Sequence, residues 1–201
     1  MKASGLKFAL ALAAALVATS AVAQQPDVVR VRGTIEKVDG QTLSVKSRDG
    51  VAMKVVLAPN APVSEVVKAS LSDIKEGSYI AITAMPQPDG SQKASTIFIF
   101  PPGAHPGEGF HPWDYAPSST MTNATVANQV TSADGQTLTV KYKDGEKKIM
   151  VSASTEIVSP RKATAADLKA GQKIFIFAAK KQPDGTLQAP NLAFGNYGVW
   201  R

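Results

Sequence analysis

Asp39-Gly-Gln-Thr-Leu-Ser-Val-Lys46 returns as Asp134-Gly-Gln-Thr-Leu-Thr-Val-Lys141, 95 residues later in the chain (134 minus 39). Two further segments recur at nearly the same spacing: Gln87-Pro-Asp-Gly90 returns as Gln182-Pro-Asp-Gly185, and Asp73-Ile-Lys-Glu-Gly77 returns as Asp167-Leu-Lys-Ala-Gly171. Self-similarity at a fixed spacing indicates that two copies of one supersecondary unit or small domain make up most of the chain.

Each copy begins with short segments in which apolar and polar residues alternate, the pattern typical of antiparallel strands. In the first strand Val29, Val31 and Ile35 share the inward side. Gly33 interrupts that side, and its counterpart in the second copy is Asn128. Both residue types tolerate unusual backbone angles, so we expect a bulge or sharp bend at this position.

Turn signals divide the rest of each copy. The Asp-Gly pairs at Asp39, Asp49, Asp134 and Asp144 predict tight hairpins, which make the first three strands a meander. Next come the helical turns predicted at Ser70 to Glu76 and at Thr164 to Ala170, and two more strands follow each of them. This order is typical of an OB barrel, so we predict an all-β protein of two tandem five-stranded OB-like barrels, each with a short helical turn between strands 3 and 4.

These motifs together extend over almost all of the chain after residue 23. In this pattern the chain resembles a family of exported bacterial tandem OB-like proteins of unknown function, some of whose members carry the description of a metal transporter permease. The resemblance implies a fold and a compartment outside the cytoplasm, and it implies no established activity. A permease needs membrane spans, and no segment after residue 23 is apolar enough to provide one.

The first 23 residues have the three parts of a secretory signal. Lys2 and Lys7 give a positive start, Phe8 to Val17 is apolar, and Ala21-Val-Ala23 is a small-residue cleavage site. We therefore expect cleavage near Ala23 and a soluble mature protein that is periplasmic or secreted. The expected divisions are a signal peptide at 1–23, a first repeat at 24–100, a linker at 101–122 and a second repeat at 123–201.

Cysteine is absent from the sequence, so core burial rather than disulfides has to hold an exported protein of this kind together. The whole chain holds 22 basic and 16 acidic residues. Residues 28–100 hold nine basic and seven acidic side chains, whereas residues 123–201 hold eleven and six. The second repeat is therefore the more basic one.

The linker carries both histidines of the chain. Imidazole and carboxylate side chains suit first-row divalent metals such as copper, nickel and zinc, and a short loop can wrap one ion. The candidate metal ligands are His105, Glu108, His111, Asp114 and Met121.

The same stretch is open to a structural interpretation. Strand parity places several aromatic side chains on the outward side of the fourth and fifth strands, where they need a cover. We expect the two barrels to pack together there, with a linker aromatic at the edge of the seam. The residues of this predicted seam are Phe98, Phe100, Trp113, Phe175 and Phe177.

A third candidate surface is a basic patch at the second hairpin of the second repeat. It comprises Lys141, Lys143, Lys147 and Lys148, and it suits an anionic envelope polymer. The second strand of each repeat lacks the aromatic pair that stacks bases, so we expect no nucleic-acid partner.

The residues suggest no catalytic constellation. A serine-type hydrolase needs a base of histidine type, and both histidines lie in the loop between the repeats. The sequence therefore predicts a non-catalytic periplasmic binding or accessory protein for an unknown ligand or envelope protein. Two alternatives remain open, a divalent-metal-binding protein that uses the linker and a binder of anionic envelope polymer.

Overall fold

The computed structural model describes residues 28–132 and 135–197, so the predicted signal segment and Asp134 of one predicted turn lie outside the described residues. The protein is all-β. Its described strands in chain order are β1 (Val28–Asp39), β2 (Thr42–Ser47), β3 (Ala52–Leu57), β4 (Val63–Lys68), β5 (Tyr79–Pro86), β6 (Gln92–Ile99), β7 (Gly109–Pro112), β8 (Thr120–Ser132), β9 (Gly135–Tyr142), β10 (Gly145–Val151), β11 (Glu156–Ala163), β12 (Lys173–Lys181), β13 (Leu187–Ala189) and β14 (Leu192–Gly195).

Five of these strands close on themselves into a β-barrel, which we call the first ring. Its pairing order is β1, β2, β3, β13 and β12, and β12 pairs back onto β1. Every contact in this cycle is antiparallel except that between β3 and β13, which is parallel. Strands β1 to β3 come from the first repeat, and β12 and β13 come from the second.

Backbone pairing also closes a second set of five strands, the second ring. Its order is β8, β9, β10, β6 and β5, and β5 pairs back onto β8. Here β5 and β6 come from the first repeat and the other three from the second. The expectation of one barrel for each repeat is therefore not confirmed, because each ring combines the first three strands of one repeat with later strands of the other.

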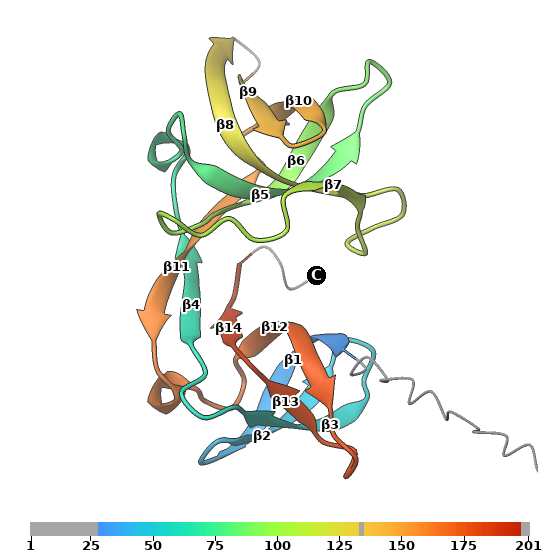
Figure 1. The fold of residues 1–201 in the computed structure, drawn as a ribbon, viewed down its shortest axis with the longest axis vertical. Helices are drawn as coiled ribbons and strands as arrows, with labels where there is room; N and C mark the ends of the chain where they lie inside the picture. Colours follow the sequence, from blue (N-terminus) through green and yellow to red (C-terminus); the bar gives the residue numbers. More distant parts are fainter. Residues whose placement is uncertain (1–27, 133–134, 198–201) are drawn as a thin grey trace, which may run out of the picture.

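Two strands that the sequence analysis did not predict produce this exchange. Strand β4 follows the first meander and β11 follows the second, and the two pair antiparallel with each other. Figure 1 shows them side by side between the two rings. Each one carries its chain away from the ring that its repeat began and into the other ring.

The pairing registers show that the exchange has approximate two-fold symmetry. Val66 of β4 pairs with Pro160 of β11, and the aligned Asp73 and Asp167 motifs make these two positions equivalent (160 minus 66 and 167 minus 73 both equal 94). On the flanks, β14 pairs parallel with β4, and β6 pairs parallel with β11. The two repeats therefore meet as the two subunits of a symmetric dimer do.

Each hydrophobic core is likewise composite. The core of the first ring is made of residues from both repeats, namely Val31, Ile35, Leu43, Val45, Val55, Leu57, Val63, Leu168, Ile174, Ile176, Ala179, Leu187, Ala189, Leu192 and Phe194. The core of the second ring is Ile74, Ile80, Ile82, Ala84, Ala94, Ile97, Ala124, Val126, Leu138, Val140, Ile149, Val151 and Ile157. Neither repeat can bury its apolar face without the other.

The strand pairing of the first hairpin differs between the two repeats by four residues. Ile35 pairs with Val45 in the β1–β2 hairpin, ten residues later, whereas Val126 pairs with Val140 in the β8–β9 hairpin, fourteen residues later. Gly171 donates its N–H to the carbonyl of Ile35 (2.8 Å), and Gly77 donates to Val126 in the same way (2.9 Å). Ile35 and Val126 are thus equivalent at a spacing of 91, whereas the sequence motif repeats at 95. The structural counterpart of Gly33 is consequently Ala124 rather than Asn128.

The bulge that the sequence predicts at Gly33 lies at another position in the strand. The β1–β2 register shifts between Ile35 and Lys37, and the β8–β9 register shifts between Val126 and Asn128. Gly33 is needed for a different reason, since an added Cβ would lie 2.5 Å from the carbonyl oxygen of Lys46. The first strand therefore requires glycine where it crosses β2 closely.

We call the antiparallel pair of β4 and β11 the β4–β11 ribbon. A 3-10 helix of three residues follows each of these two strands, so it does not come directly after the third strand of its repeat, as the sequence suggested. These helices are η1 (Leu71–Asp73) and η2 (Ala165–Asp167). The carboxylate of Asp73 accepts hydrogen bonds from the backbone N–H and hydroxyl of Ser70 (2.7 and 2.8 Å), and Asp167 accepts the same pair from Thr164. Both carboxylates thus fix the corner that turns β4 or β11 into the next strand.

The composite core makes a prediction about energetic coupling. Val31 and Ile176 are buried cross-strand partners from different repeats, whereas Ile82 is the first-repeat equivalent of Ile176 and lies in the other ring. Ile176→Ala should lower the free energy of unfolding by about 2–5 kcal/mol. A double-mutant cycle with Val31→Ala should give a coupling of at least ~0.5 kcal/mol, because the two side chains share a core.

The matched control cycle pairs Val31→Ala with Ile82→Ala. The two changes should add within about 0.5 kcal/mol, because the residues lie in different rings. Both cycles are measured by urea unfolding. Additivity for Val31 with Ile176, together with coupling for Val31 with Ile82, would contradict the exchanged arrangement.

Candidate binding surfaces

The linker between the repeats forms an additional strand, β7, and a loop whose Asp114 binds Arg30 and Arg32 of β1. We call this ion-pair contact the Asp114 clasp. Strand β7 pairs with the start of β8, where Gly109 lies opposite Asn123 and His111 opposite Met121. Beyond β7, Trp113 donates its N–H to the carbonyl of Ser119 (2.8 Å), and the Ser119 hydroxyl donates to the carbonyl of Trp113 (2.9 Å). These bonds fix the loop that carries Trp113 and Asp114.

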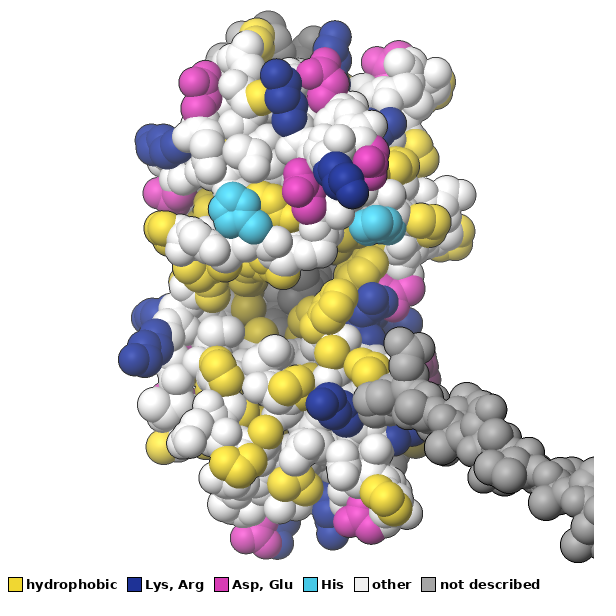
Figure 2. All heavy atoms as spheres, viewed as in Figure 1, with side chains coloured by type: hydrophobic (Ala, Val, Ile, Leu, Met, Phe, Trp, Pro, Cys, Tyr) yellow, Lys and Arg dark blue, Asp and Glu magenta, His cyan; other side chains and the backbone are white. Residues whose placement is uncertain are grey.

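The five predicted metal ligands lie in different surroundings. His105 stacks on Tyr79 with ring centroids 4.5 Å apart, and Figure 2 shows the two histidines at separate places on one face. Met121 is buried on β8, and Asp114 is held by arginines of the first ring. Among the described residues no group of three or more histidine, cysteine or acidic side chains could hold a metal ion. Metal binding by the linker stays a prediction.

Glu108 of the predicted ligand set acts electrostatically on Tyr79. Burial raises the pKa of the Tyr79 hydroxyl, and the nearby charge of Glu108 raises it further. The same hydroxyl donates a hydrogen bond to the carbonyl of Pro106 (3.2 Å). The first part of the linker is thus attached to the second ring.

Asp114 crosses from the linker to two arginines on β1. Its Oδ2 accepts from Arg30 (3.1 Å) and from Arg32 (2.8 Å), while its Oδ1 accepts a second bond from Arg32 (2.9 Å). The Arg32 side chain is only 8% exposed, and that of Asp114 is 46% exposed. The hydrogen bond from Arg32 and the charges of both arginines lower the pKa of Asp114 from 3.8 to about 2.

Aromatic rings surround the same two guanidinium groups. The Arg30 guanidinium carbon lies 4.2 Å from the Trp113 ring centroid and 5.2 Å from that of Phe177. The Arg32 carbon lies 5.2 Å from Phe175 and 5.4 Å from Trp113. Such contacts attract a cation to the ring face. We call Arg30, Arg32, Trp113, Asp114, Phe175 and Phe177 the arginine–aromatic cluster.

The five residues of the predicted seam fall into two groups, which share Phe175. Phe98 and Phe175 pack against Val66 and Val158 at the centre of the β4–β11 ribbon, and Phe98 makes an edge contact with Phe100 (4.9 Å). Trp113 and Phe177 belong to the arginine–aromatic cluster. Phe177 is 59% exposed, so it lies outside the buried ribbon contact.

The lysines of the predicted basic patch have acidic or aromatic neighbours. Lys141 lies directly across from Glu146, and Lys143 is in the turn between β9 and β10. Lys147 places its ammonium nitrogen 4.6 Å from the Phe110 ring centroid. The charge of Lys148 helps to lower the pKa of Asp89, after hydrogen bonds from Ser91 as the main cause. Residues 141–148 thus hold four lysines and two acidic residues, a net charge of +2 rather than +4.

A more basic surface lies on the outer side of the first ring. The strands of the first ring carry eight basic and two acidic residues, whereas those of the second ring carry four and one. Thr34 pairs with Lys46 on one side and with Lys173 on the other, so the two lysines flank one threonine in a row across β2, β1 and β12. Arg48 lies in the next row, where its N–H bonds to the carbonyl of Arg32 (2.9 Å).

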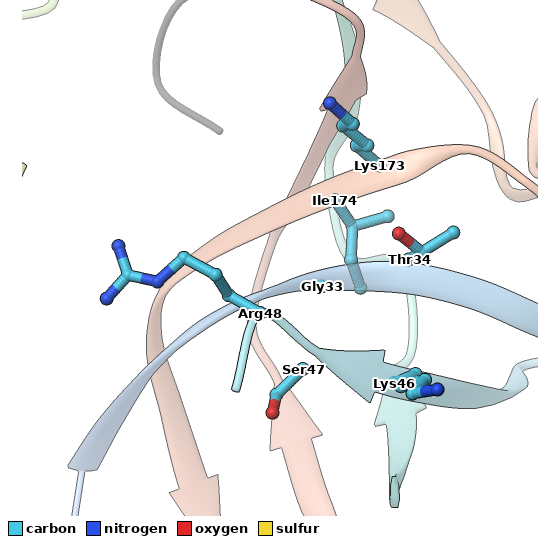
Figure 3. Close-up of a pocket in the computed structure, with 7 residues that line it drawn as sticks. All are labelled: Gly33, Thr34, Lys46, Ser47, Arg48, Lys173 and Ile174. Carbon is cyan, nitrogen blue, oxygen red and sulfur yellow. The ribbon is translucent and has the colours of Figure 1, made fainter. Parts of the chain in front are cut away.

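A cavity of about 280 Å³ lies at this row, and Gly33 and the buried Ile174 are part of its lining. Its described lining holds three cationic side chains and none that is acidic, and Figure 3 shows Lys46, Arg48 and Lys173 pointing in different directions around it. Charges spread in this way suit an extended anion better than one small compact ion. We call Thr34, Lys46, Ser47, Arg48 and Lys173 the basic face.

The sequence analysis missed both the basic face and the arginine pair. Arg30 and Arg32 alternate with inward valines on β1, a signal that was available in the sequence. Lys173 belongs to the other repeat, and only the exchange of strands brings it beside Thr34 and Lys46. Adding up the charge of each repeat therefore could not reveal the basic face, and the Lys141 hairpin stays a prediction.

Comparison with known protein families gives a match to part of the chain. The family described as a domain of unknown function (DUF5666) matches residues 129–191. No curated protein and no solved structure matches the chain. In the described part of the chain, no helix has the length and apolar character needed to cross a membrane.

The Asp114 clasp predicts a specific pH dependence. Because the pKa of Asp114 is lowered in the folded state, its contribution to stability is complete above about pH 4 and is lost as the pH falls through about 2. Asp114→Asn should therefore lower the melting temperature near neutral pH, by about 2–4 °C for a partly exposed pair worth roughly 1 kcal/mol. The gap should close as the pH falls from about 4 to below 2.

Thermal unfolding of the wild type and Asp114→Asn across this pH range checks the prediction. Asp144→Asn is the control, because it removes a carboxylate from the exposed β9–β10 turn. A gap of the same size at neutral and at strongly acid pH would show that ionisation of Asp114 does not hold the clasp.

Proposed function

We propose that this protein is an exported, non-catalytic binding protein of the bacterial cell envelope, and that it holds an anionic polymer on the basic face. Export rests on the secretory pattern of residues 1–23, with periplasmic localisation as its consequence. We further propose that each ring is an OB-like barrel, a fold that commonly presents a ligand-binding face.

The observation that carries the proposal is the row of Lys46, Thr34 and Lys173 with Arg48 beside it. Neighbouring positions across strands lie about 5 Å apart, so the row gathers cations from three strands over a short distance. The cavity at this row has no acidic residue in its described lining. Arg48 Nε lies 3.7 Å from Oδ1 of the adjacent Asp49, so Lys46 and Lys173 supply the excess positive charge of the row. A positive field of this kind raises the local concentration of an anionic ligand.

A polymer fits better than a single small anion. The three cationic groups diverge around the cavity, so one compact ion could not contact all of them (Figure 3). A chain with repeated negative charges can contact them in succession. The hydroxyl of Thr34 between the two lysines adds a neutral hydrogen-bonding group, which suits the hydroxyls of a sugar.

Charge reversal tests the proposed function. Lys46→Glu with Lys173→Glu should weaken the binding of fluorescent polygalacturonate about tenfold or more at low salt, because attraction becomes repulsion on the proposed face. Wild-type binding should fall steeply as salt is raised, because exposed charges are screened beyond ~10 Å at 0.1 M. Fluorescence anisotropy measures both effects.

The control is Lys141→Glu with Lys143→Glu, which makes the same charge change on the β9–β10 hairpin. It should weaken binding far less, because that hairpin already carries Glu146 opposite Lys141. Equal loss in the two double variants would indicate general charge attraction, and an unchanged affinity in Lys46→Glu with Lys173→Glu would reject the basic face as the site.

A further inference from the structure

The clasp of Asp114 has the chemistry of a ligand contact. One carboxylate receives three hydrogen bonds from two arginines, and two of these bonds form a bidentate pair with Arg32. Bidentate contact is the geometry by which arginine recognises carboxylate groups specifically. The carboxylate itself comes from the linker, which lies outside both rings.

The two partners of this contact differ in access to solvent. The Arg32 side chain is 8% exposed, whereas that of Asp114 is 46% exposed. Arg32 is thus fixed in the surface of the first ring, and the carboxylate approaches it from the solvent side. Removal of the carboxylate would take one anionic partner from a mostly buried guanidinium, and another anion in the same place would offset that loss.

The arginines are also held in place independently of Asp114. The guanidinium of Arg32 lies over the side chain of Phe175, and that of Arg30 lies over Phe177. Both phenylalanines belong to β12. These contacts keep the two guanidinium groups oriented when the carboxylate is exchanged. The exposed ring of Phe177 adds an apolar surface beside the charge, as a sugar ring would require.

This arginine pair is continuous with the basic face. Arg32 and Thr34 are successive outward residues of β1, and the backbone of Arg48 bonds to that of Arg32 (2.9 Å). A polymer that contacts Lys46 and Lys173 therefore meets Arg32 at the next row. In the structure the Arg32 guanidinium of that row is bonded to Asp114.

We infer that Arg30 and Arg32 form a carboxylate subsite, which Asp114 fills in the free protein and a carboxylate of the bound polymer fills in its place. The polymer part of this inference rests on the proposed function, and the subsite itself does not. The linker is then a competitor for the site, so that only a ligand with repeated carboxylates displaces it effectively. The ligand class is a polyuronate-like acidic polysaccharide.

Chemical rescue with acetate tests the subsite by itself. Asp114→Ala should lower the melting temperature in sodium chloride, and sodium acetate at the same ionic strength of about 0.1 M should restore at least about half of the loss. Acetate should have no such effect on Asp144→Ala, which removes an equally charged side chain from an exposed turn. Asp114→Ser, which keeps a polar group, replaces Asp114→Ala if that variant does not fold.

Equal melting temperatures of the Asp114 variant in acetate and chloride would overturn the subsite. Adding Arg30→Gln to Asp114→Ala should weaken the rescue, because acetate then loses one of its two cationic partners. Rescue that persists unchanged in this double variant would mean that acetate acts elsewhere, and it would also overturn the assignment.

Polygalacturonate binding forms the second arm. Asp114→Ala should bind the polymer about fivefold more tightly than Asp144→Ala, because both remove one negative charge and only the first removes the competitor. Acetate rescue without any polymer binding would support the subsite and reject the proposed polymer ligand. Polymer binding that is equal in the two variants, without acetate rescue, would reject the subsite and leave the basic face as the binding surface.

Discussion

The antiparallel pairing of β4 with β11 determines the path of the whole chain. These two strands occupy equivalent places in the two repeats and meet at Val66 and Pro160. A strand that pairs with its own counterpart runs away from the meander that precedes it, so the strands that follow must close onto the other repeat. The ribbon is sealed by Val66 and Val158, with Phe98 and Phe175 packed against them.

This constraint creates the surfaces on which the proposed function depends. Because β12 of the second repeat pairs with β1 of the first, Lys173 lies across from Thr34, and Phe175 lies across from Arg32. The excess positive charge of the second repeat is thereby carried in part to the first ring. The linker also spans both rings, since His105 stacks on Tyr79 of the second ring while Asp114 binds arginines of the first.

Much of the local structure could be predicted from the sequence. The alternation around Val31 and Ile35, the turn at Asp39-Gly40 and the inward isoleucines of β5 and β12 follow from strand periodicity and turn chemistry. The exchange could not be predicted, because an inward residue such as Ile176 has the same pattern whether its partner Val31 belongs to its own repeat or to the other. The four-residue register shift of the first hairpin is equally hidden, since the Asp-Gly-Gln-Thr motif is the same in both repeats.

Cutting the chain in the linker tests the exchange most directly. A protease recognition sequence inserted at Gly103, in the exposed turn where Ala104 bonds to the carbonyl of Pro101, allows cleavage between the repeats of the folded protein. Because each core contains side chains of both repeats, the two fragments should stay together as a 1:1 complex in native gel filtration and separate only in denaturant. Two folded fragments that elute independently under native conditions would contradict the account.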